Sequence, residues 1–163
     1  MRILSICIYK DNTKLIHVFN LTKNNNYINS ILMENGLFYS QIMNKKTEKY
    51  KKLSSNLNYK GLMIHSYKNN NNICVIIITT HDYPIRVAYD CMNNLLKLNE
   101  TNKIDRKMLN IYIIKCSNPE NIDKLSKVKN KIKETKMIIH KNINILLDRE
   151  EKLDDLVNKS EIL

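Results

Sequence analysis

The chain is poor in the residues that form tight turns and aromatic platforms. Its 163 residues include two glycines, two prolines, two phenylalanines and no tryptophan. This scarcity excludes glycine-rich phosphate-binding loops and argues against a nucleic-acid surface built on stacked aromatic rings. No apolar run approaches the roughly eighteen residues of a membrane span. The length suits one small domain with a packed core, together with an appendage.

Cysteine and histidine form no metal-ligand pattern. The four cysteines lie far apart without a CxxC pair, and the four histidines include no i, i+4 pair. We therefore expect no metal site, no cofactor and no disulfide framework. The cysteines are expected to be reduced core residues, because free cysteine packs as a small hydrophobe. They are Cys7, Cys74, Cys91 and Cys116.

Positive charge is in excess. Lysine and arginine total 27 against 16 acidic residues, a net charge of +11, which favours an anionic membrane surface or a nucleic acid as partner. Much of this charge is lysine beside asparagine runs at 24–26 and 69–72, which require no ligand. Near the end of the chain, residues 124–141 are basic and residues 148–161 are acidic. This asymmetry suits charged partner helices better than a phosphate track, so a basic nucleic-acid-binding module is the alternative hypothesis.

The first hundred residues mix strand and helix periodicities. Apolar alternation and β-branched runs predict five strands, at residues 3–9, 15–19, 51–57, 62–67 and 73–80. The first two are joined by a turn at 11–13, and the continuously apolar run 75–78 predicts a central strand. One helix is predicted around residues 28–43, and a second follows Pro84, which suits a first helical position, with Asp82 ahead of it as an acceptor for free amides.

The most informative feature is a heptad seam near the C-terminus. Its positions alternate three and four residues apart, as in helices that supercoil around one another. Eight of the twelve are apolar; the twelve are Leu125, Val128, Ile132, Thr135, Ile139, Asn142, Leu146, Arg149, Leu153, Leu156, Ser160 and Leu163.

Arg149 interrupts this seam with a charge. Burying a guanidinium costs several kcal/mol unless acceptors meet it, so a partner that supplies acceptors is expected, and the arginine would then fix the register of the assembly. The alternative is that Arg149 extends along the edge of an amphipathic helix with its head in water.

Residues 134–163, which contain Leu-Leu-Asp-Arg-Glu-Glu-Lys-Leu-Asp-Asp-Leu-Val, resemble the R-SNARE motif of the prenylated longin-type R-SNAREs, the Ykt-six family of synaptobrevin homologues. The turn Tyr-Pro-Ile-Arg-Val-Ala at 83–88 and the opening Met-Arg-Ile-Leu-Ser-Ile-Cys-Ile-Tyr-Lys resemble the longin domain of the same family. In that family the arginine is the ionic central layer of a four-helix bundle and faces one glutamine from each of three Q-SNARE helices. The resemblance assigns this role to Arg149, with Leu146 and Leu153 as flanking layers.

The resemblance implies an α+β fold. A longin (profilin-like) domain, a five-stranded antiparallel sheet sandwiched by helices, would cover 1–117, and a partial SNARE coiled-coil helix would cover 118–163. One segment is ambiguous, because Met108–Cys116 is β-branched enough to indicate a strand whereas the family has a third helix there; we follow the family. Asn118 and Pro119 are typical of a helix start at the junction.

The resemblance also implies function. The chain would be an R-SNARE, not an enzyme, that zippers with three Q-SNARE helices to drive vesicle fusion in ER, Golgi or vacuolar transport. The longin domain would target and inhibit it by binding the folded-back SNARE segment, with Phe38 as a regulatory contact or, alternatively, an ordinary core aromatic. Without a partner and without this contact, the SNARE segment would stay loosely disordered, because its apolar residues would have nothing to pack against.

The relatives continue to a paired-cysteine CaaX ending, so we expect this chain to be truncated within the SNARE motif. Its membrane contact would come from a lipidated tail absent from this chain, which implies a cytoplasmic protein that is peripheral on the cytosolic face of Golgi, ER and vesicle membranes. A further alternative, longin-assisted acyl transfer to cysteine, is disfavoured because spacing places no histidine beside Cys91.

Overall fold

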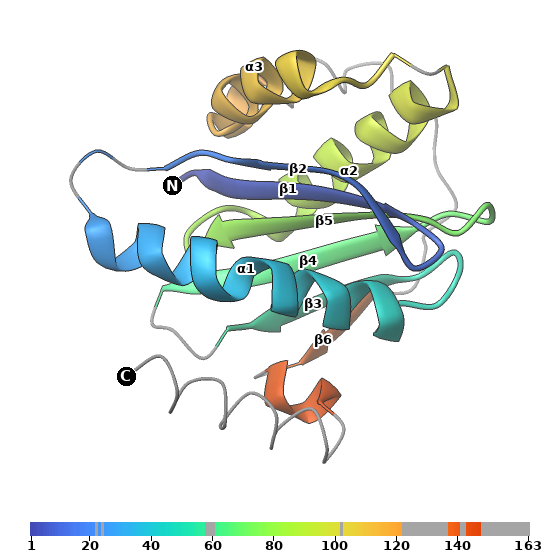
Figure 1. Ribbon diagram of the computed structural model, residues 1–163, viewed down its shortest axis with the longest axis horizontal. Helices are drawn as coiled ribbons and strands as arrows, with labels where there is room; N and C mark the ends of the chain where they lie inside the picture. Colours follow the sequence, from blue (N-terminus) through green and yellow to red (C-terminus); the bar gives the residue numbers. More distant parts are fainter. Residues whose placement is uncertain are drawn as a thin grey trace.

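The computed structural model describes residues 1–21, 23, 25–57, 61–101, 103–121, 137–140 and 143–147. Six strands form one sheet in the order β2-β1-β5-β4-β3-β6 (Figure 1). The strands are β1 (Ile3–Lys10), β2 (Thr13–Phe19), β3 (Lys52–Asn56), β4 (Leu62–Lys68), β5 (Ile73–Thr80) and β6 (Met137–His140). The helices are α1 (Asn26–Lys46), α2 (Ile85–Glu100), α3 (Arg106–Cys116) and the 3-10 turn η1 (Ile143–Leu146).

The first five strands confirm the predicted antiparallel sheet. Each pairs antiparallel with its neighbour, and the first two are joined through Asp11 and Asn12, with Asp11 at φ 53°. Strand β5 lies between β1 and β4, and its residues 73–79 are all buried. This explains the continuous apolar run, because a strand covered on both faces needs no polar alternation.

The strand count predicted from the sequence is one too low. β6 pairs parallel with β3, so the sheet has six strands and is mixed. The heptad pattern predicts helix over Met137–His140, yet in this structure the run Met-Ile-Ile-His is extended. Its two isoleucines suit a strand as well as a helix, and only the presence of the β3 edge selects between them.

Helix α1 covers one face of the sheet. Asn25 caps it by accepting a hydrogen bond from the backbone N–H of Ile28 at 3.1 Å. Its buried side packs on what we call the α1 core, which also takes buried residues from β1, β3, β4 and β5, with Phe19 of β2 and Ile138 of β6 half-buried against it. The core includes Leu4, Tyr9, Ile31, Leu32, Tyr39, Met43, Leu53, Leu57, Ile64, Ile76 and Ile143.

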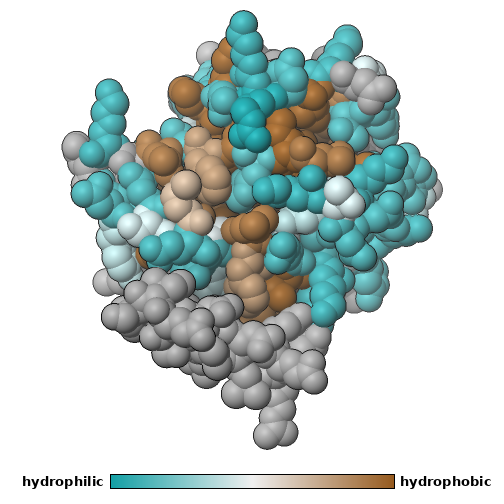
Figure 2. All heavy atoms as spheres, viewed as in Figure 1, coloured by the Kyte–Doolittle hydropathy of each residue, from teal (hydrophilic) through white to brown (hydrophobic). Residues whose placement is uncertain are grey.

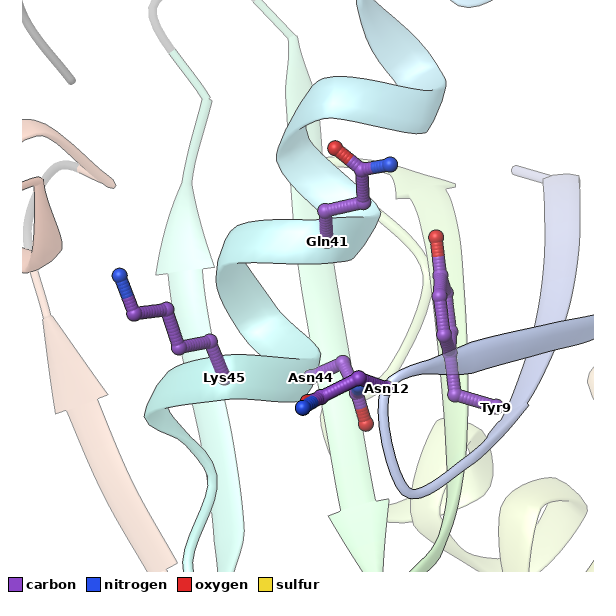
Figure 3. Close-up of a pocket in the computed structure, with 5 residues that line it drawn as sticks. All are labelled: Tyr9, Asn12, Gln41, Asn44 and Lys45. Carbon is purple, nitrogen blue, oxygen red and sulfur yellow. The ribbon is translucent and has the colours of Figure 1, made fainter.

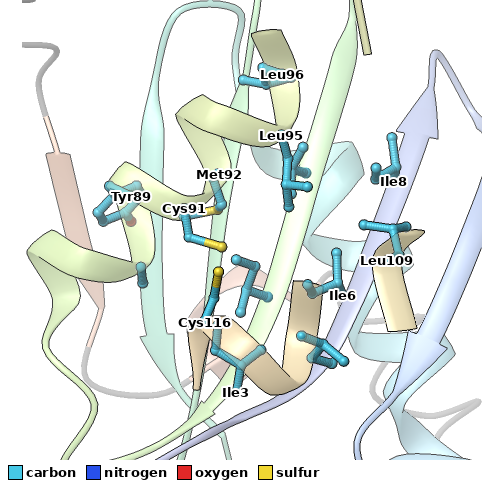
Figure 4. Packing of buried hydrophobic residues seen from close by; sticks show 14 of the residues in the cluster. Ile3, Ile6, Ile8, Tyr89, Cys91, Met92, Leu95, Leu96, Leu109 and Cys116 are labelled. Carbon is cyan, nitrogen blue, oxygen red and sulfur yellow. The ribbon is translucent and has the colours of Figure 1, made fainter. Parts of the chain in front are cut away.

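Helices α2 and α3 cover the opposite face, where a second core joins them to β1 and β5 (Figure 4). The second helix begins at Ile85 rather than Pro84, which lies in the preceding extended position. Asp82 does not cap it; its carboxylate accepts instead from the Thr80 hydroxyl at 2.6 Å. In its apolar stripe Ala88, Met92, Leu95 and Leu96 are buried, and Ile85 is half-buried.

Residues 108–116 are helical, as the family resemblance implied and their β-branched content did not. The Asp105 side chain accepts from the backbone N–H of Met108 at 2.7 Å, and Leu109, Ile113 and Cys116 are buried. A cap and a helical period thus outweigh the local strand propensity. Asn118 accepts from the backbone N–H of Glu120 at 3.1 Å, so the predicted cap at the junction is present, and residues 119–121 are helical.

Candidate functional site

The edge of β3 carries the feature that best indicates function. Without β6, β3 would end the sheet and leave a row of unpaired backbone groups. Strand β6 lies along this edge in parallel register, with Leu53 opposite Ile138 and Ser54 opposite Ile139. Because β6 belongs to the segment that carries the heptad seam, the chain adds a strand from its own C-terminal part to its N-terminal sheet, in the manner of strand addition.

The two isoleucines of β6 point to opposite faces, as successive residues in a strand must. Ile138 is half-buried and packs against the α1 core, whereas Ile139 is 58% exposed. One side of β6 is therefore part of the hydrophobic packing, and the side that carries the predicted seam residue is not.

The turn η1 continues this contact on the α1 side of the sheet. Ile143 is fully buried in the α1 core, and Leu146 is half-buried against it. Leu147 follows and is 8% exposed. The segment after β6 is thus held to the domain by apolar burial as well as by strand pairing.

Phe38 lies on α1 and packs against the same α1 core. It is half-buried, and its ring meets that of Tyr39 edge-on with the centroids 5.4 Å apart. The structure therefore brings Phe38, Ile138 and Leu146 to one cluster, although it does not by itself assign Phe38 a regulatory role.

Most of the predicted seam lies outside the described residues. Ile139 and Leu146 are placed as given above. The others are Leu125, Val128, Ile132, Thr135, Asn142, Arg149, Leu153, Leu156, Ser160 and Leu163.

Sequence analysis missed Ile138, Ile143 and Leu147, which are among the apolar residues that β6, η1 and the following position supply to the contact. The sequence does contain an indication of this contact, because these three residues are apolar and lie off the heptad seam. Apolar residues outside the main stripe of an amphipathic helix imply a second surface to cover.

Beneath β3, a buried polar network joins strands β3, β4 and β5 to α2. Ser54 Oγ lies 2.7 Å from His65 Nδ1 and 2.5 Å from the Tyr89 hydroxyl, and His65 Nε2 lies 3.1 Å from Thr79 Oγ1. Burial lowers the pKa of His65 to about 4, which keeps the ring neutral near neutral pH. All four side chains are buried, so the network ties the three strands to α2.

All four cysteines are withdrawn from the surface. All are free and buried, and burial raises the pKa of Cys7 and of Cys74 to about 12 and raises that of Cys91 well above its ordinary value. Figure 4 shows Cys91 and Cys116 pointing toward each other inside the second core. Within the described part of the chain, no three His, Cys, Asp or Glu residues are grouped to hold a metal ion.

A small polar recess lies between the β1–β2 turn and the end of α1 (Figure 3). Its volume is about 330 Å³, and it is lined by Tyr9, Asn12, Gln41, Asn44 and Lys45. Asn44 donates from its side-chain amide to the carbonyl of Asp11 at 2.7 Å. This hydrogen bond ties the helix to the hairpin, and the lining residues include no paired acid and base for catalysis.

Figure 2 shows one surface with hydrophobic residues exposed among hydrophilic ones. On α1 the exposed apolar side chains are Tyr27, Met33 and Leu37.

Among the described residues, no helix is both long and apolar enough to cross a bilayer.

Comparison with known proteins agrees with the sequence resemblance. The synaptobrevin family model matches residues 124–163. The synaptobrevin homolog YKT6 of Saccharomyces cerevisiae is 38% identical over 120 residues, which cover 65% of this chain and 58% of that protein. The YKT6 homologue of Debaryomyces hansenii is 33% identical over 141 residues, covering 77% of this chain and 69% of the relative. The ykt6 homologue of Schizosaccharomyces pombe is 32% identical over 112 residues, which cover 62% of this chain and 57% of that protein.

An α+β domain followed by a segment that matches synaptobrevin is the arrangement of the longin-type R-SNAREs. The chain belongs to the YKT6 family of synaptobrevin homologues. These are SNARE proteins and not enzymes, as the sequence predicted, and neither the nucleic-acid nor the acyl-transfer alternative gains support from them. The match spans 58% of the length of the Saccharomyces relative.

Proposed function

We propose that this chain is an R-SNARE whose C-terminal segment, residues 118–163, zippers with three Q-SNARE helices into a four-helix bundle that drives fusion of vesicles with target membranes. Arg149 is the central ionic layer of that bundle. Burial of successive apolar layers, at roughly 25 cal/mol per Å² of apolar surface, supplies the driving force. Support comes from family membership and from the heptad seam that surrounds Arg149.

The N-terminal domain, residues 1–117, inhibits this assembly. The observation that carries this part is the pairing of β6 with β3, because a backbone held as a strand cannot at the same time be a bundle helix. Burial of Ile143 in the α1 core further stabilises this folded-back state. Phe38 is part of the surface of the N-terminal domain that binds the segment.

The proposed location follows the family resemblance. The protein acts peripherally on the cytosolic face of Golgi, ER and vesicle membranes and reaches them through a lipidated C-terminal tail. The transport step is one between the ER, the Golgi and the vacuole.

The test is a charge swap at the central layer. The full chain is mixed with recombinant Q-SNARE motifs, and assembly is followed by circular dichroism and size-exclusion chromatography. Arg149→Gln weakens assembly or changes its register, and combining it with a Q-SNARE whose central glutamine is replaced by arginine restores both. Lys152→Gln, which changes a charge off the seam, is the matched control and assembles as the wild type does. Unchanged register and stoichiometry in Arg149→Gln would refute the assigned layer.

A further inference from the structure

The segment from 137 to 147 has apolar residues both on and off the heptad seam, and the structure buries mainly residues that lie off it. Seam positions in the described part of this segment are Ile139 and Leu146. Off the seam, Ile138, Ile143 and Leu147 are buried or half-buried, and Ile145 is 63% exposed.

Burial separates the two sets. Ile143 is fully buried and Leu147 is 8% exposed, whereas the seam residue Ile139 is 58% exposed. Ile138 packs against the α1 core. Leu146 is the one described residue that both uses share, since it is a seam position and also packs against that core.

Helix geometry places Leu147 outside the core of a bundle and the other two residues at its margins. With 3.5 residues per turn, Leu147 would lie about 130° from the centre of the seam, on the outer face of the helix. Ile138 and Ile143 would lie on its two flanks, about 77° away. A leucine on the outer face gains nothing from zippering, whereas in the folded-back form its side chain is almost wholly withdrawn from water.

We propose that Ile138, Ile143 and Leu147 are docking residues for the N-terminal domain, part of a second recognition surface that overlaps the R-SNARE seam in sequence and shares only Leu146 with it among the described residues. This deepens the inhibition part of the proposed function and rests on it. Closure and zippering exclude each other through the backbone, because the β6–β3 pairing and a bundle helix require different conformations of the same residues. Apart from Leu146, different side chains set the strength of closure and of zippering, so a substitution at one of them can change one without the other.

The experiment uses four single variants of the full chain, each with glutamine, a residue of good helix propensity. Ile143→Gln and Leu147→Gln remove docking residues, and Ile139→Gln removes a seam residue that is exposed in the folded-back form. Ile145→Gln is the matched control, because Ile145 is 63% exposed and lies off the seam. Amide hydrogen exchange of residues 137–147 reports docking, and the amides of β1 and β5 in the same samples report whether the domain is folded.

Ile143→Gln and Leu147→Gln speed exchange across 137–147 by roughly tenfold or more, as loss of a buried apolar side chain predicts, while β1 and β5 stay protected. Ile139→Gln and Ile145→Gln leave exchange unchanged. The inference is overturned if both docking variants exchange as the wild type does, or if Ile139→Gln loosens the segment as much as they do.

Assembly with Q-SNARE motifs is measured on the same four variants. Ile139→Gln weakens assembly, whereas Leu147→Gln matches or exceeds the wild type. If no variant and no wild-type protein assembles with Q-SNAREs but the exchange pattern holds, the proposed function fails and the assignment of the docking residues stands. If Leu147→Gln weakens assembly as much as Ile139→Gln, the two surfaces are not separate and the inference fails.

Discussion

Leu53 of β3 and Ile138 of β6 are register partners in the parallel strand pair that extends the sheet, and both take part in the α1 core. At this pair of residues the N-terminal domain therefore binds the C-terminal segment both through the backbone pairing of β3 with β6 and through apolar packing.

The first prediction concerns Phe38. Phe38→Ala removes a ring that packs against the α1 core, so we expect exchange of the amides of 143–147 to become several-fold faster while β5 stays protected. Leu37→Ala is the matched control, because Leu37 precedes Phe38 on α1 but its side chain is exposed. Equal exchange in the two variants would mean that Phe38 is an ordinary core aromatic.

The second prediction concerns Gly36 within α1. Its Cβ would meet Phe19 Cε1 at 3.7 Å, an ordinary contact. Gly36→Ala should therefore raise the free energy of unfolding by roughly 0.5–1 kcal/mol, because alanine loses less backbone freedom on forming a helix. Urea denaturation measures the change. Gly61→Ala is the contrasting variant: with φ at +84°, it should lower stability by about 1 kcal/mol.

The third prediction is a pH dependence. Burial lowers the pKa of His65 from 6.5 to about 4, so between these values the unfolded chain binds a proton that the folded protein excludes. His65 thus favours the folded state fully above pH 6.5, and this contribution is lost as the pH falls toward 4, by about 3 kcal/mol in total.

Denaturation across pH 4 to 7 measures this slope in the wild type and in His65→Gln. The variant should lose about half of it, because burial also lowers the pKa of His17 to about 4, whereas His81→Gln, which changes an exposed side chain, should keep it. An unchanged slope in His65→Gln would show that other groups cause the acid sensitivity.

The fourth prediction concerns the Tyr89 hydroxyl, which lies 2.5 Å from Ser54 Oγ in the network beneath β3. Tyr89→Phe should lower the free energy of unfolding by about 1 kcal/mol, the net worth of one hydrogen bond. The loss stays small because Ser54 keeps its contact with His65. Tyr27→Phe, at an exposed position, should have no effect, and a similar loss there would argue against the network.

Much of the domain could be predicted from local pattern. The strand Ile73–Thr80 is as predicted, because eight residues without a charge at the centre of a sheet leave a clear signal. Residues 108–116 show the limit. Their β-branched residues indicate a strand, and only the cap at Asp105 and the burial of Leu109 and Ile113 make them a helix.

The sequence by itself determined the order of strands and helices along the first hundred residues, the family, and the heptad spacing around Arg149, because these depend on periodicity and on residue identity. Only the tertiary structure decided that Met137–His140 is a strand and that Ile143 is buried. The physical reason is that a short β-branched run has no strong preference of its own. The open edge of β3, more than eighty residues earlier in the chain, supplies the backbone partners that make it extended.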